Sequence, residues 1–329
     1  MTVAIVILNW NGKALLEKFI PYVVKFSGYA TIYVADNAST DGSVDFLKLH
    51  FPQVNIIKNK INGGYAKGYN DALKNIEADI FCLLNNDVEV TANWLEPIIT
   101  TFKTDANTAI IQPKLLDYKN RSYFEYAGAA GGYIDKFGYP YCRGRIFNTV
   151  EKDTKQYDNN CPILWASGAC LFIKSEIFKT LGGFDESYFA HMEEIDLCWR
   201  AHNLGYAINY IGNSTVYHVG GATLSNTNPQ KTYLNFRNSL FTLVKNTNQN
   251  LCIIIFARLV LDGLAGVMFL TQLKPLHTIA ILKAHFSFYH YLKILLKKRK
   301  TILKRKDYYH KTSIVWLYFV NNKKHFSKL

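Results

Sequence analysis

The most informative stretch of the chain reads Leu83-Leu84-Asn85-Asn86-Asp87-Val88-Glu89-Val90. The apolar run Ile80–Leu84 predicts a buried strand, and a cluster of oxygen-bearing side chains follows it directly. Mg²⁺ and Mn²⁺ prefer oxygen ligands and are usually shared between carboxylates and phosphate oxygens. Because open α/β sheets bind ligands at the carboxyl ends of their strands, Asp87 is a candidate metal ligand facing a substrate diphosphate. Because Asn-Asn-Asp also forms plain turns, the neighbouring segments are needed to choose between a metal site and a turn.

Strand and helix patterns alternate through residues 1–90. The predicted strands are Val3–Leu8, Thr31–Ala35, Val54–Lys58 and Ile80–Leu84, and the predicted helices are Lys13–Lys25, which Pro21 interrupts, Val44–His50 and Ala66–Ile76. Strands that alternate with short helices predict an α/β fold with a mostly parallel, doubly wound sheet.

The second part of the chain is less regular. Residues 105–165 are rich in Gly, Tyr and Asn, which indicates hairpins and loops around a site. Further apolar or periodic segments predict a strand at Ile163–Ile173, a helix at Glu194–Asn203 and short strands at Ala207–Tyr210 and Ser214–Val219. After about residue 225 the pattern changes to long amphipathic helices.

The charge of the chain is concentrated in its last part. The formal net charge is +13, and residues 271–329 hold 14 Lys and Arg against one acid, so residues 1–270 are neutral. The first 270 residues therefore lack the basic balance of a nucleic-acid-binding domain. The six cysteines have no zinc-like spacing, and Met1–Val6 has no basic region of a signal peptide. Both features are typical of a protein of a reducing compartment.

Residues Leu251–Leu270 form an apolar stretch that is interrupted by Arg258 and Asp262. Its length is sufficient to cross a bilayer, but two central charges cost roughly 2.5–3.5 kcal/mol each on insertion scales. The two charges are four residues apart and are able to pair. We expect helices that lie in or re-enter a membrane surface, with the basic clusters attracted to anionic lipid. The alternative is a helical cap or dimer interface with a solvated basic tail.

Two further segments carry polar groups at predicted strand ends or helix starts. Asp36 follows the second strand and is able to accept hydrogen bonds from a base or a ribose; the alternative is an Asx-turn with a helix N-cap at Asp41 or Ser43. The glycine-rich segment Asn62–Asn70 leads into a helix whose N-terminus favours anions. It does not fit the dinucleotide fingerprint, and a left-handed turn before a helix explains the glycines equally well.

The segment Phe184–Arg200 is dense in acids. Asp196 and Arg200 have the spacing of an ion pair on one helix face. Glu193 and Glu194 stand at the predicted helix start, where the dipole favours carboxylates; two adjacent acids also suit a general base with a raised pKa.

His218 precedes two glycines that leave room for a ligand, although a lone His on a strand is more often structural. Trp165, Tyr133 and Tyr139 have the rings to stack on sugars, or belong to the core.

Taken in order, eight segments of the chain resemble glycosyltransferase family 2, the inverting enzymes with a GT-A fold, and are most similar to its rhamnosyltransferase-like members. The segments are Val6–Gly12, Val34–Ser43, Asn62–Asn70, Leu83–Asp87, Gly168–Ile173, Gly182–Glu186, Glu193–Arg200 and Tyr217-His218. Each motif is weak alone, but their order over about residues 1–240 is specific.

The resemblance implies a role for individual residues. Asp87 matches the metal ligand of the D-x-D position, where Asn85 replaces the first Asp, and His218 matches a third ligand position. The family's base is the Asp of a Glu-Asp pair, which here is Glu194, with Glu193 beside it. Asp36 would contact the nucleotide base. The implied donor-binding residues are Asn9, Asn11, Asp36, Asn62, Gly63, Gly64, Lys67, Asn85 and Asn86. The implied acceptor-binding residues are Trp165 and Gly168.

The expected organisation is a catalytic domain over residues 1–225 and a helical, basic, membrane-associated region over 226–329. Residues 1–100 would bind the nucleotide sugar and 101–225 the acceptor. The resemblance implies a metal-dependent (Mn²⁺ or Mg²⁺) inverting transfer from dTDP-rhamnose or a UDP-sugar to a hydroxyl of a glycan or lipid-linked acceptor, in cell-surface polysaccharide synthesis. The expected location is cytoplasmic, peripheral or monotopic at the inner membrane, with no nucleic-acid partner.

Two other functions remain open from the sequence. The first is a non-catalytic protein that binds sugar nucleotides, although the chain retains Asp36, Asp87, Glu194 and His218 together. The second is a sugar nucleotidyltransferase. Such enzymes usually carry a glycine-rich loop with Arg or Lys after the first strand, and Asn9–Lys13 does not match it.

Overall fold

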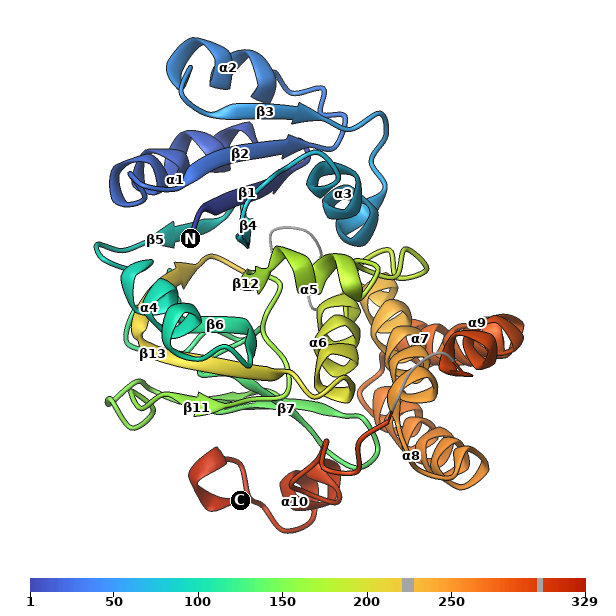
Figure 1. Cartoon of the computed structure of the whole chain (residues 1–329). Helices are drawn as coiled ribbons and strands as arrows, with labels where there is room; N and C mark the ends of the chain where they lie inside the picture. Colours follow the sequence, from blue (N-terminus) through green and yellow to red (C-terminus); the bar gives the residue numbers. More distant parts are fainter. Residues whose placement is uncertain (221–227, 301–303) are drawn as a thin grey trace.

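The computed structural model describes residues 1–220, 228–300 and 304–329. The strands of the main sheet are β1 (Val3–Asn9), β2 (Thr31–Asp36), β3 (Asn55–Lys58), β4 (Ile80–Asn85), β5 (Val88–Val90), β6 (Thr108–Asp117), β11 (Cys161–Pro162), β12 (Cys170–Lys174) and β13 (Ala207–His218). They form one nine-stranded sheet in the order β11-β13-β6-β12-β4-β1-β2-β3, with β5 paired to β13 (Figure 1). The strands of the first half are parallel, as predicted, and β12 is inserted antiparallel between β4 and β6.

Helices cover both faces of this sheet (Figure 1). The helices of the described residues are α1 (Lys13–Phe26), α2 (Ser43–His50), α3 (Gly64–Leu73), α4 (Glu96–Thr104), α5 (Ser175–Thr180), α6 (Glu193–Asn203), α7 (Pro229–Asn246), α8 (Leu251–Thr271), α9 (Pro275–Lys300) and α10 (Ile314–Phe319), with a short 3-10 helix at Phe326–Lys328. One buried cluster joins α1, α2 and α4 to the sheet, and a second joins α3, α5, α6 and α7. This is the two-sided covering that a mostly parallel sheet requires.

The structure corrects two predictions in the first two hundred residues. Helix α1 continues through Pro21, because Pro21 lies on the exposed face, where solvent can satisfy the carbonyl that loses its partner. The predicted strand at Ile163–Ile173 begins only at Cys170. The residues before it form isolated hydrogen bonds with Gly132, including Leu164 N–H to Gly132 O at 2.9 Å.

Two other strands also differ from the sequence pattern. Strand β6 was not predicted, because Gln112 and Lys114 interrupt its apolar run; both are buried, and Lys114 pairs with Asp153 at 3.2 Å. The two short strands expected after residue 206 are one strand, β13, with a register shift between Ile211 and Thr215. Such an irregularity bends a strand without ending it.

The hairpins expected within residues 105–165 are present as a second sheet of four short strands. These are β7 (Gly132–Ile134), β8 (Pro140–Cys142), β9 (Arg145–Ile146) and β10 (Thr149–Val150). Ile314 of α10 packs on this sheet through Tyr141 and Ile146, so the C-terminal residues cover it (Figure 1).

Helix α7 is tied to α6 by buried ion pairs. The predicted pair of Asp196 and Arg200 is confirmed at 2.9 Å, and Lys245 of α7 lies 2.8 Å from Asp196 and 2.7 Å from Asp185. Helices α8 and α9 lie outside α7 (Figure 1). The predicted domain boundary between residues 225 and 226 lies outside the described residues, and the division into domains stays a prediction.

Candidate active site

Asp87 and His218 meet at the carboxyl end of β4. Asp87 lies in the turn between β4 and β5, and the pairing of β5 with β13 places His218 opposite Val88. As a result, His218 Nε2 lies 3.1 Å from Asp87 Oδ1, and both side chains are buried. The amide of Asn85 is 3.5 Å from the same imidazole nitrogen. The structure therefore brings together the residues of the predicted metal motif.

Glu125 lies on the other side of the imidazole. Its Oε1 is 3.2 Å from His218 Nδ1, and its Oε2 accepts the Ala127 N–H at 2.6 Å. Burial acts to lower the pKa of His218, but the carboxylates of Glu125 and Asp87 raise it to about 10. Burial acts to raise the pKa of Asp87, but the charge and hydrogen bond of His218 hold it below its usual value. Asp87 is therefore ionised at neutral pH.

The chemistry of this cluster fits a divalent cation. With its pKa at about 10, His218 is protonated at neutral pH and donates its Nε2–H to Asp87 Oδ1 at 3.1 Å, so a cation would replace that proton in order to bind both atoms. A carboxylate behind a metal-binding imidazole is the usual orienting partner, and Glu125 has that position. Among the described residues, no group of three or more His, Cys, Asp or Glu side chains is arranged to hold a metal. A cation here would take its remaining ligands from a substrate and water.

The loops after β1 and β4 form the wall beside this cluster. Asn86 Nδ2 donates to Asn9 Oδ1 at 2.8 Å, and both amides lie directly under Gly12. A Cβ at Gly12 would clash with both amides, so the backbone of the loop sits directly on the pair. Predicted donor-binding residues from two strand ends are thus joined in one surface.

Asp36 is held in the next loop along the sheet edge. Its Oδ2 accepts the Ser39 N–H at 2.9 Å, and its Oδ1 accepts from Asn9 at 3.3 Å. Asn11 continues the same contact, because its N–H donates to Ser39 Oγ at 2.9 Å. Asp36 is buried, and each of its oxygens keeps a second lone pair for a ligand. The alternative interpretation of this segment is confirmed in part: Asp41 accepts the Ser43 N–H at 3.0 Å in an Asx-turn, but the N-cap residue of α2 is Gly42.

The glycine-rich turn packs against the loop that precedes α6. Asn62 Oδ1 accepts the Gly64 N–H at 3.0 Å, and the Tyr65 N–H donates to Phe189 O at 3.0 Å. Gly64 has φ +77°, and a Cβ there would clash with the same Phe189 carbonyl. Gly63 lies against the side chain of Lys67. The glycines therefore serve a close approach between two parts of the chain.

The Lys67 ammonium forms ion pairs with two carboxylates outside the cluster around Asp87. Its ammonium is 2.9 Å from Asp71 on the same helix and 3.7 Å from Glu186. A role in donor binding would require it to leave or share these partners, and stays a prediction.

Glu193 and Glu194 begin α6, and both are removed from water. Glu193 is buried, whereas Glu194 is only partly buried. Burial raises the pKa of Glu194 to about 7, although the N–H groups of the first turn of α6 act in the opposite direction. Burial and the charge of Glu194 raise the pKa of Glu193 well above its usual range. The Oε2 atom of each glutamate has no hydrogen-bond partner in the described part of the chain. Such atoms at a helix start are suited to a ligand proton.

The backbone just before Glu193 is strained. His191 and Met192 have φ values of 70° and 73°, in the left-handed region that favours glycine. Asn238 of α7 holds this turn, because its amide donates to Ala190 O at 2.9 Å and to His191 O at 2.8 Å. Strain that the surrounding structure maintains is typical of functional sites.

Tyr65 and Cys142 lie within electrostatic reach of the glutamates. Tyr65, whose hydroxyl donates to Gly168 O at 2.8 Å, has its pKa raised mainly by burial and further by Glu193 and Glu194. The Cys142 thiol lies within electrostatic reach of both Glu125 and Glu194, although burial is the main cause of its raised pKa. Glu125 contacts His218, and Asn85 at the end of β4 donates its N–H to Ala169 O at 3.0 Å, next to the Gly168 carbonyl that Tyr65 contacts.

Of the three aromatic residues that are candidates for sugar stacking, Trp165 is buried, whereas Tyr133 and Tyr139 are partly exposed. Trp165 is buried, lies on Gly132, and donates its indole N–H to Tyr133 O at 2.9 Å. Tyr139 donates to Asp262 at 2.7 Å. Gly168 is placed beside Tyr65, next to the glutamates. The acceptor-binding roles of Trp165 and Gly168 stay predictions.

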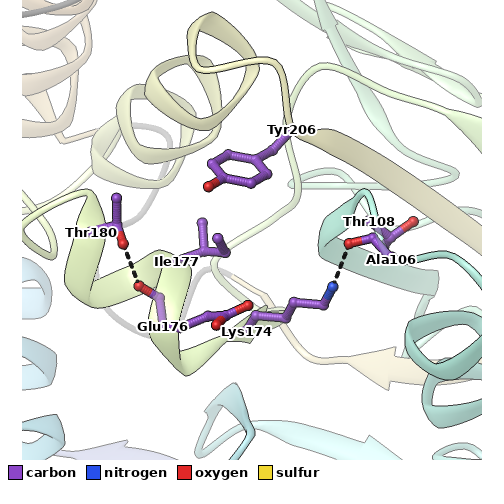
Figure 2. Close-up of a pocket in the computed structure, with 7 residues that line it drawn as sticks. All are labelled: Ala106, Thr108, Lys174, Glu176, Ile177, Thr180 and Tyr206. Atoms are coloured by element: carbon purple, nitrogen blue, oxygen red, sulfur yellow. Dashed lines mark hydrogen bonds between the residues drawn. The ribbon is translucent and has the colours of Figure 1, made fainter.

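A cavity of about 170 Å³ lies elsewhere (Figure 2). Its lining includes Lys174, which donates to Ala106 O at 2.7 Å, and Thr180, which donates to Glu176 O. Lys174 pairs with Ile80 at the start of β4, so this cavity lies at the amino ends of the strands, opposite the site. We assign it no catalytic role.

Sequence reasoning missed two residues of the site. Glu125 lies in an irregular segment, and no local pattern connects it to His218. Asn238 lies in α7, outside the eight segments that carry the family resemblance, and its backbone contacts are visible only in the fold.

Residues 4–182 match the family model described as Glycosyl transferase family 2. The match covers more than half of the chain, and the chain belongs to glycosyltransferase family 2. The fold class is the expected GT-A fold, a mixed α/β architecture with a largely parallel central sheet.

The resemblance to rhamnosyltransferases is confirmed by a relative. An N-acetylglucosaminyl-diphospho-decaprenol L-rhamnosyltransferase of Mycobacterium tuberculosis (strain ATCC 25618 / H37Rv) is 24% identical over 203 residues, which are 57% of this chain and 66% of that protein. The low-salt glycan biosynthesis hexosyltransferase Agl10 of Haloferax volcanii is 25% identical over 203 residues, 60% of this chain and 61% of that protein. The chain therefore spans less than two thirds of the length of either relative.

Two solved structures share the fold at low identity. GalNAc-T7 with UDP, GalNAc and Mn²⁺ has a TM-score of 0.59 at 18% identity, over 74% of this chain and 48% of that one. The mannosyltransferase PcManGT from Pyrobaculum calidifontis, in complex with GDP-Man and Mn²⁺, has a TM-score of 0.53 at 12% identity, over 87% and 86%.

Proposed function

We propose that the chain transfers a sugar from a nucleoside-diphosphate donor to a hydroxyl of a glycan or lipid-linked acceptor, with inversion at the anomeric carbon. The proposal is carried by the buried Asp87–His218 pair at the carboxyl end of β4 and is supported by Glu194, whose carboxylate has an unpartnered oxygen in the described part of the chain. Similar proteins are named as a rhamnosyltransferase and a hexosyltransferase. No observation favours the nucleotidyltransferase or the non-catalytic alternative.

The donor would lie along the carboxyl ends of β1, β2 and β4. The amides of Asn9, Asn86 and Asn85 and the carboxylate of Asp36 border this edge. Asp87 and His218 would hold Mn²⁺ or Mg²⁺, which fits the two solved structures that contain Mn²⁺. When bound, the cation would neutralise negative charge on the leaving diphosphate.

Glu194 would be the general base. An acceptor hydroxyl attacks the anomeric carbon, its proton passes to the Glu194 carboxylate, and the bond to the nucleoside diphosphate breaks on the opposite side of the sugar. A pKa of about 7 suits this transfer near neutral pH, and the partial exposure of Glu194 favours it over the buried Glu193. Glu193 would keep its proton while Glu194 is ionised, because burial and the charge of Glu194 raise the pKa of Glu193.

The first donor to test is dTDP-rhamnose, because of the rhamnosyltransferase relative; UDP-sugars come next. The experiment is a thermal-shift screen of nucleotide sugars with and without Mn²⁺, since a ligand of the native state raises the melting temperature. Donors that shift the wild type are then incubated with a lipid-linked acceptor. The proposal requires Mn²⁺-dependent stabilisation by at least one donor and a glycosylated product. A protein that no nucleotide sugar stabilises, with or without the metal, would contradict it.

A further inference from the structure

Helix α8 has its polarity reversed relative to a helix of a soluble protein. The residues of its inner stripe are Ile254, Arg258, Asp262 and Gly266, all buried. The residues of its outer stripe are Ile253, Phe256, Val260, Leu264 and Val267, with exposures between 49% and 71%. The charges therefore point into the protein and the large apolar side chains point out, whereas a soluble surface helix shows the opposite arrangement.

The inward charges are fully engaged by the body of the protein. Arg258 donates to Asp262 at 2.8 Å, to Ser239 Oγ of α7 at 2.6 Å and to Phe137 O at 3.1 Å. Asp262 also accepts from Tyr139 at 2.7 Å. Phe137 and Tyr139 belong to the connection between β7 and β8, so this network fastens the middle of α8 to the globular body.

The same network of hydrogen bonds limits the orientations that α8 can take at a membrane. Leu251–Thr271 is the one helix in the described residues that is long and apolar enough to span, which by length and composition alone is weak support for spanning. If α8 crossed a bilayer, its centre would carry Phe137, Tyr139 and Ser239 with it into the hydrocarbon. Their loop backbone would then lie at a depth where lipid-exposed loops do not occur.

Helix α9 extends the apolar face and adds positive charge. Its exposed apolar side chains are Leu276, Ile279, Leu282, Phe286, Tyr289, Ile294 and Leu296, and Leu273 in the turn before it is 89% exposed. Lys283, Lys293 and Lys297 are exposed among them and form no salt bridge within the described residues. Long lysine side chains between apolar residues are suited to a headgroup layer, where the stem is buried and the ammonium stays wet.

We propose that the outer faces of α8 and α9 insert into the headgroup layer of an anionic lipid leaflet, with α8 parallel to the membrane plane. We call these residues the α8–α9 face. Charge selects this occupant: the exposed lysines attract anionic lipid, whereas the same lysines would repel one another across an interface between two copies of the chain. The inference does not depend on the proposed transfer reaction.

Flotation of the full-length protein with vesicles tests the surface. The vesicles are pure phosphatidylcholine, or equimolar phosphatidylcholine and phosphatidylglycerol. We expect the wild type to float with the anionic vesicles. Because each nearby lysine adds attraction to anionic lipid, its binding to pure phosphatidylcholine should be weaker by at least about tenfold. The variant F256D/L264D should lose at least about tenfold of the anionic binding, since two charges then enter the interface.

The matched control is Y29D/L49D. Tyr29 and Leu49 are also exposed, by 62% and 75%, but Tyr29 follows the end of α1 and Leu49 belongs to α2, and Figure 1 shows both helices at the other end of the molecule from α8. The control should float as the wild type does. Equal loss in both variants would overturn the α8–α9 face. The proposal would also be overturned if the wild type did not bind the vesicles and sedimented as a dimer, while the F256D/L264D variant sedimented as a monomer.

Thiol labelling from one side of the vesicle tests the orientation of α8. Cys252 is the exposed cysteine of the chain and stands at the start of α8, and Leu273→Cys in a Cys252→Ser background places a thiol just past its end. Protein is bound to the outside of sealed vesicles, and a membrane-impermeant maleimide is added. An in-plane helix leaves both thiols reactive. Protection of one thiol until detergent is added would show a spanning helix and overturn the proposal.

Discussion

His218 Nε2 lies 3.1 Å from Asp87 Oδ1, although the two residues belong to different halves of the chain. The pairing of β5 with β13 creates this contact, because it sets His218 opposite Val88. The second imidazole nitrogen faces Glu125 at 3.2 Å. A carboxylate, an imidazole and an orienting carboxylate are thus aligned at the end of β4, the edge at which open α/β sheets bind their ligands.

Substitution of the orienting carboxylate should weaken metal binding without removing a ligand. We expect Glu125→Gln to lower Mn²⁺ affinity about 10–100-fold, because loss of the negative charge makes His218 a poorer and less well oriented ligand. Calorimetric titration with Mn²⁺ in the presence of a nucleoside diphosphate measures this. Glu151→Gln is the control, because Glu151 is equally buried but pairs with Tyr157. Unchanged Mn²⁺ affinity in Glu125→Gln would remove Glu125 from the site.

The raised pKa of Glu194 predicts a pH dependence of transfer. A base with a pKa of about 7 is protonated and inactive below that pH, so kcat/KM should rise with pH and level off above about 7. Glu193, Tyr65 and Cys198 lie within electrostatic reach of Glu194, and Glu193 is expected to keep its proton while Glu194 ionises, because the charge of Glu194 raises the pKa of Glu193. A pH profile of kcat/KM that is flat from acid to neutral pH would be incompatible with Glu194 as the base.

The same raised pKa has a consequence for stability. The folded state binds the Glu194 proton more tightly than the unfolded state, in which the pKa is about 4.5. The stability gained from this proton is therefore present at acid pH and lost as pH rises through about 7. The side-chain amide of the Glu194→Gln variant cannot ionise. The melting temperature of this variant should therefore fall less than that of the wild type as the pH is raised from about 4.5 to above 7.

Gly64→Ala should damage the site far more than Gly42→Ala. Both glycines have φ near +78°, and each should lose about 1 kcal/mol of stability from the left-handed backbone. Only Gly64 faces an obstacle, the Phe189 carbonyl, whereas a Cβ at Gly42 meets nothing within 4 Å. We expect Gly64→Ala to displace the loop before Glu193 and to lower kcat. Similar denaturation midpoints and activities in the two variants would refute the role of this contact.

Asn238 is a positioning residue of the strained turn at His191. Asn238→Ala leaves two backbone carbonyls without donors, which should cost about 1–3 kcal/mol of stability and let the turn relax. Because Asn238 acts on Glu193 and Glu194 through the backbone, kcat should fall while the KM for the nucleotide sugar changes little. Asn248→Ala is the control, since Asn248 follows the end of α7. If KM rose instead and kcat were kept, Asn238 would belong to donor binding.

The first half of the fold could be predicted because its signals are local. The four parallel strands are apolar runs that end in polar clusters, so Asp36 and Asp87 were expected at one sheet edge. Strand β6 could not be predicted, because the buried Gln112 and Lys114 are satisfied by distant partners. Local patterns carry no information about such partners.

Only the site residues that have a local sequence signal could be predicted. The carboxylates Asp87, Glu193 and Glu194 stand out through their position after a strand or at a helix start. Glu125 and Asn238 act through contacts that only the folded chain creates. In the same way, the four-residue spacing of Arg258 and Asp262 indicated a pair, which is confirmed, but gave no sign that the pair faces inward.

The division of work between Asp87 and Glu194 is tested most directly by one comparison. For Asp87→Asn and Glu194→Gln, Mn²⁺-dependent thermal stabilisation by the donor is measured beside the rate of sugar transfer. We predict that Glu194→Gln keeps the stabilisation and loses transfer, whereas Asp87→Asn loses both. Wild-type stabilisation in Asp87→Asn, or wild-type transfer in Glu194→Gln, would contradict this assignment of the two carboxylates.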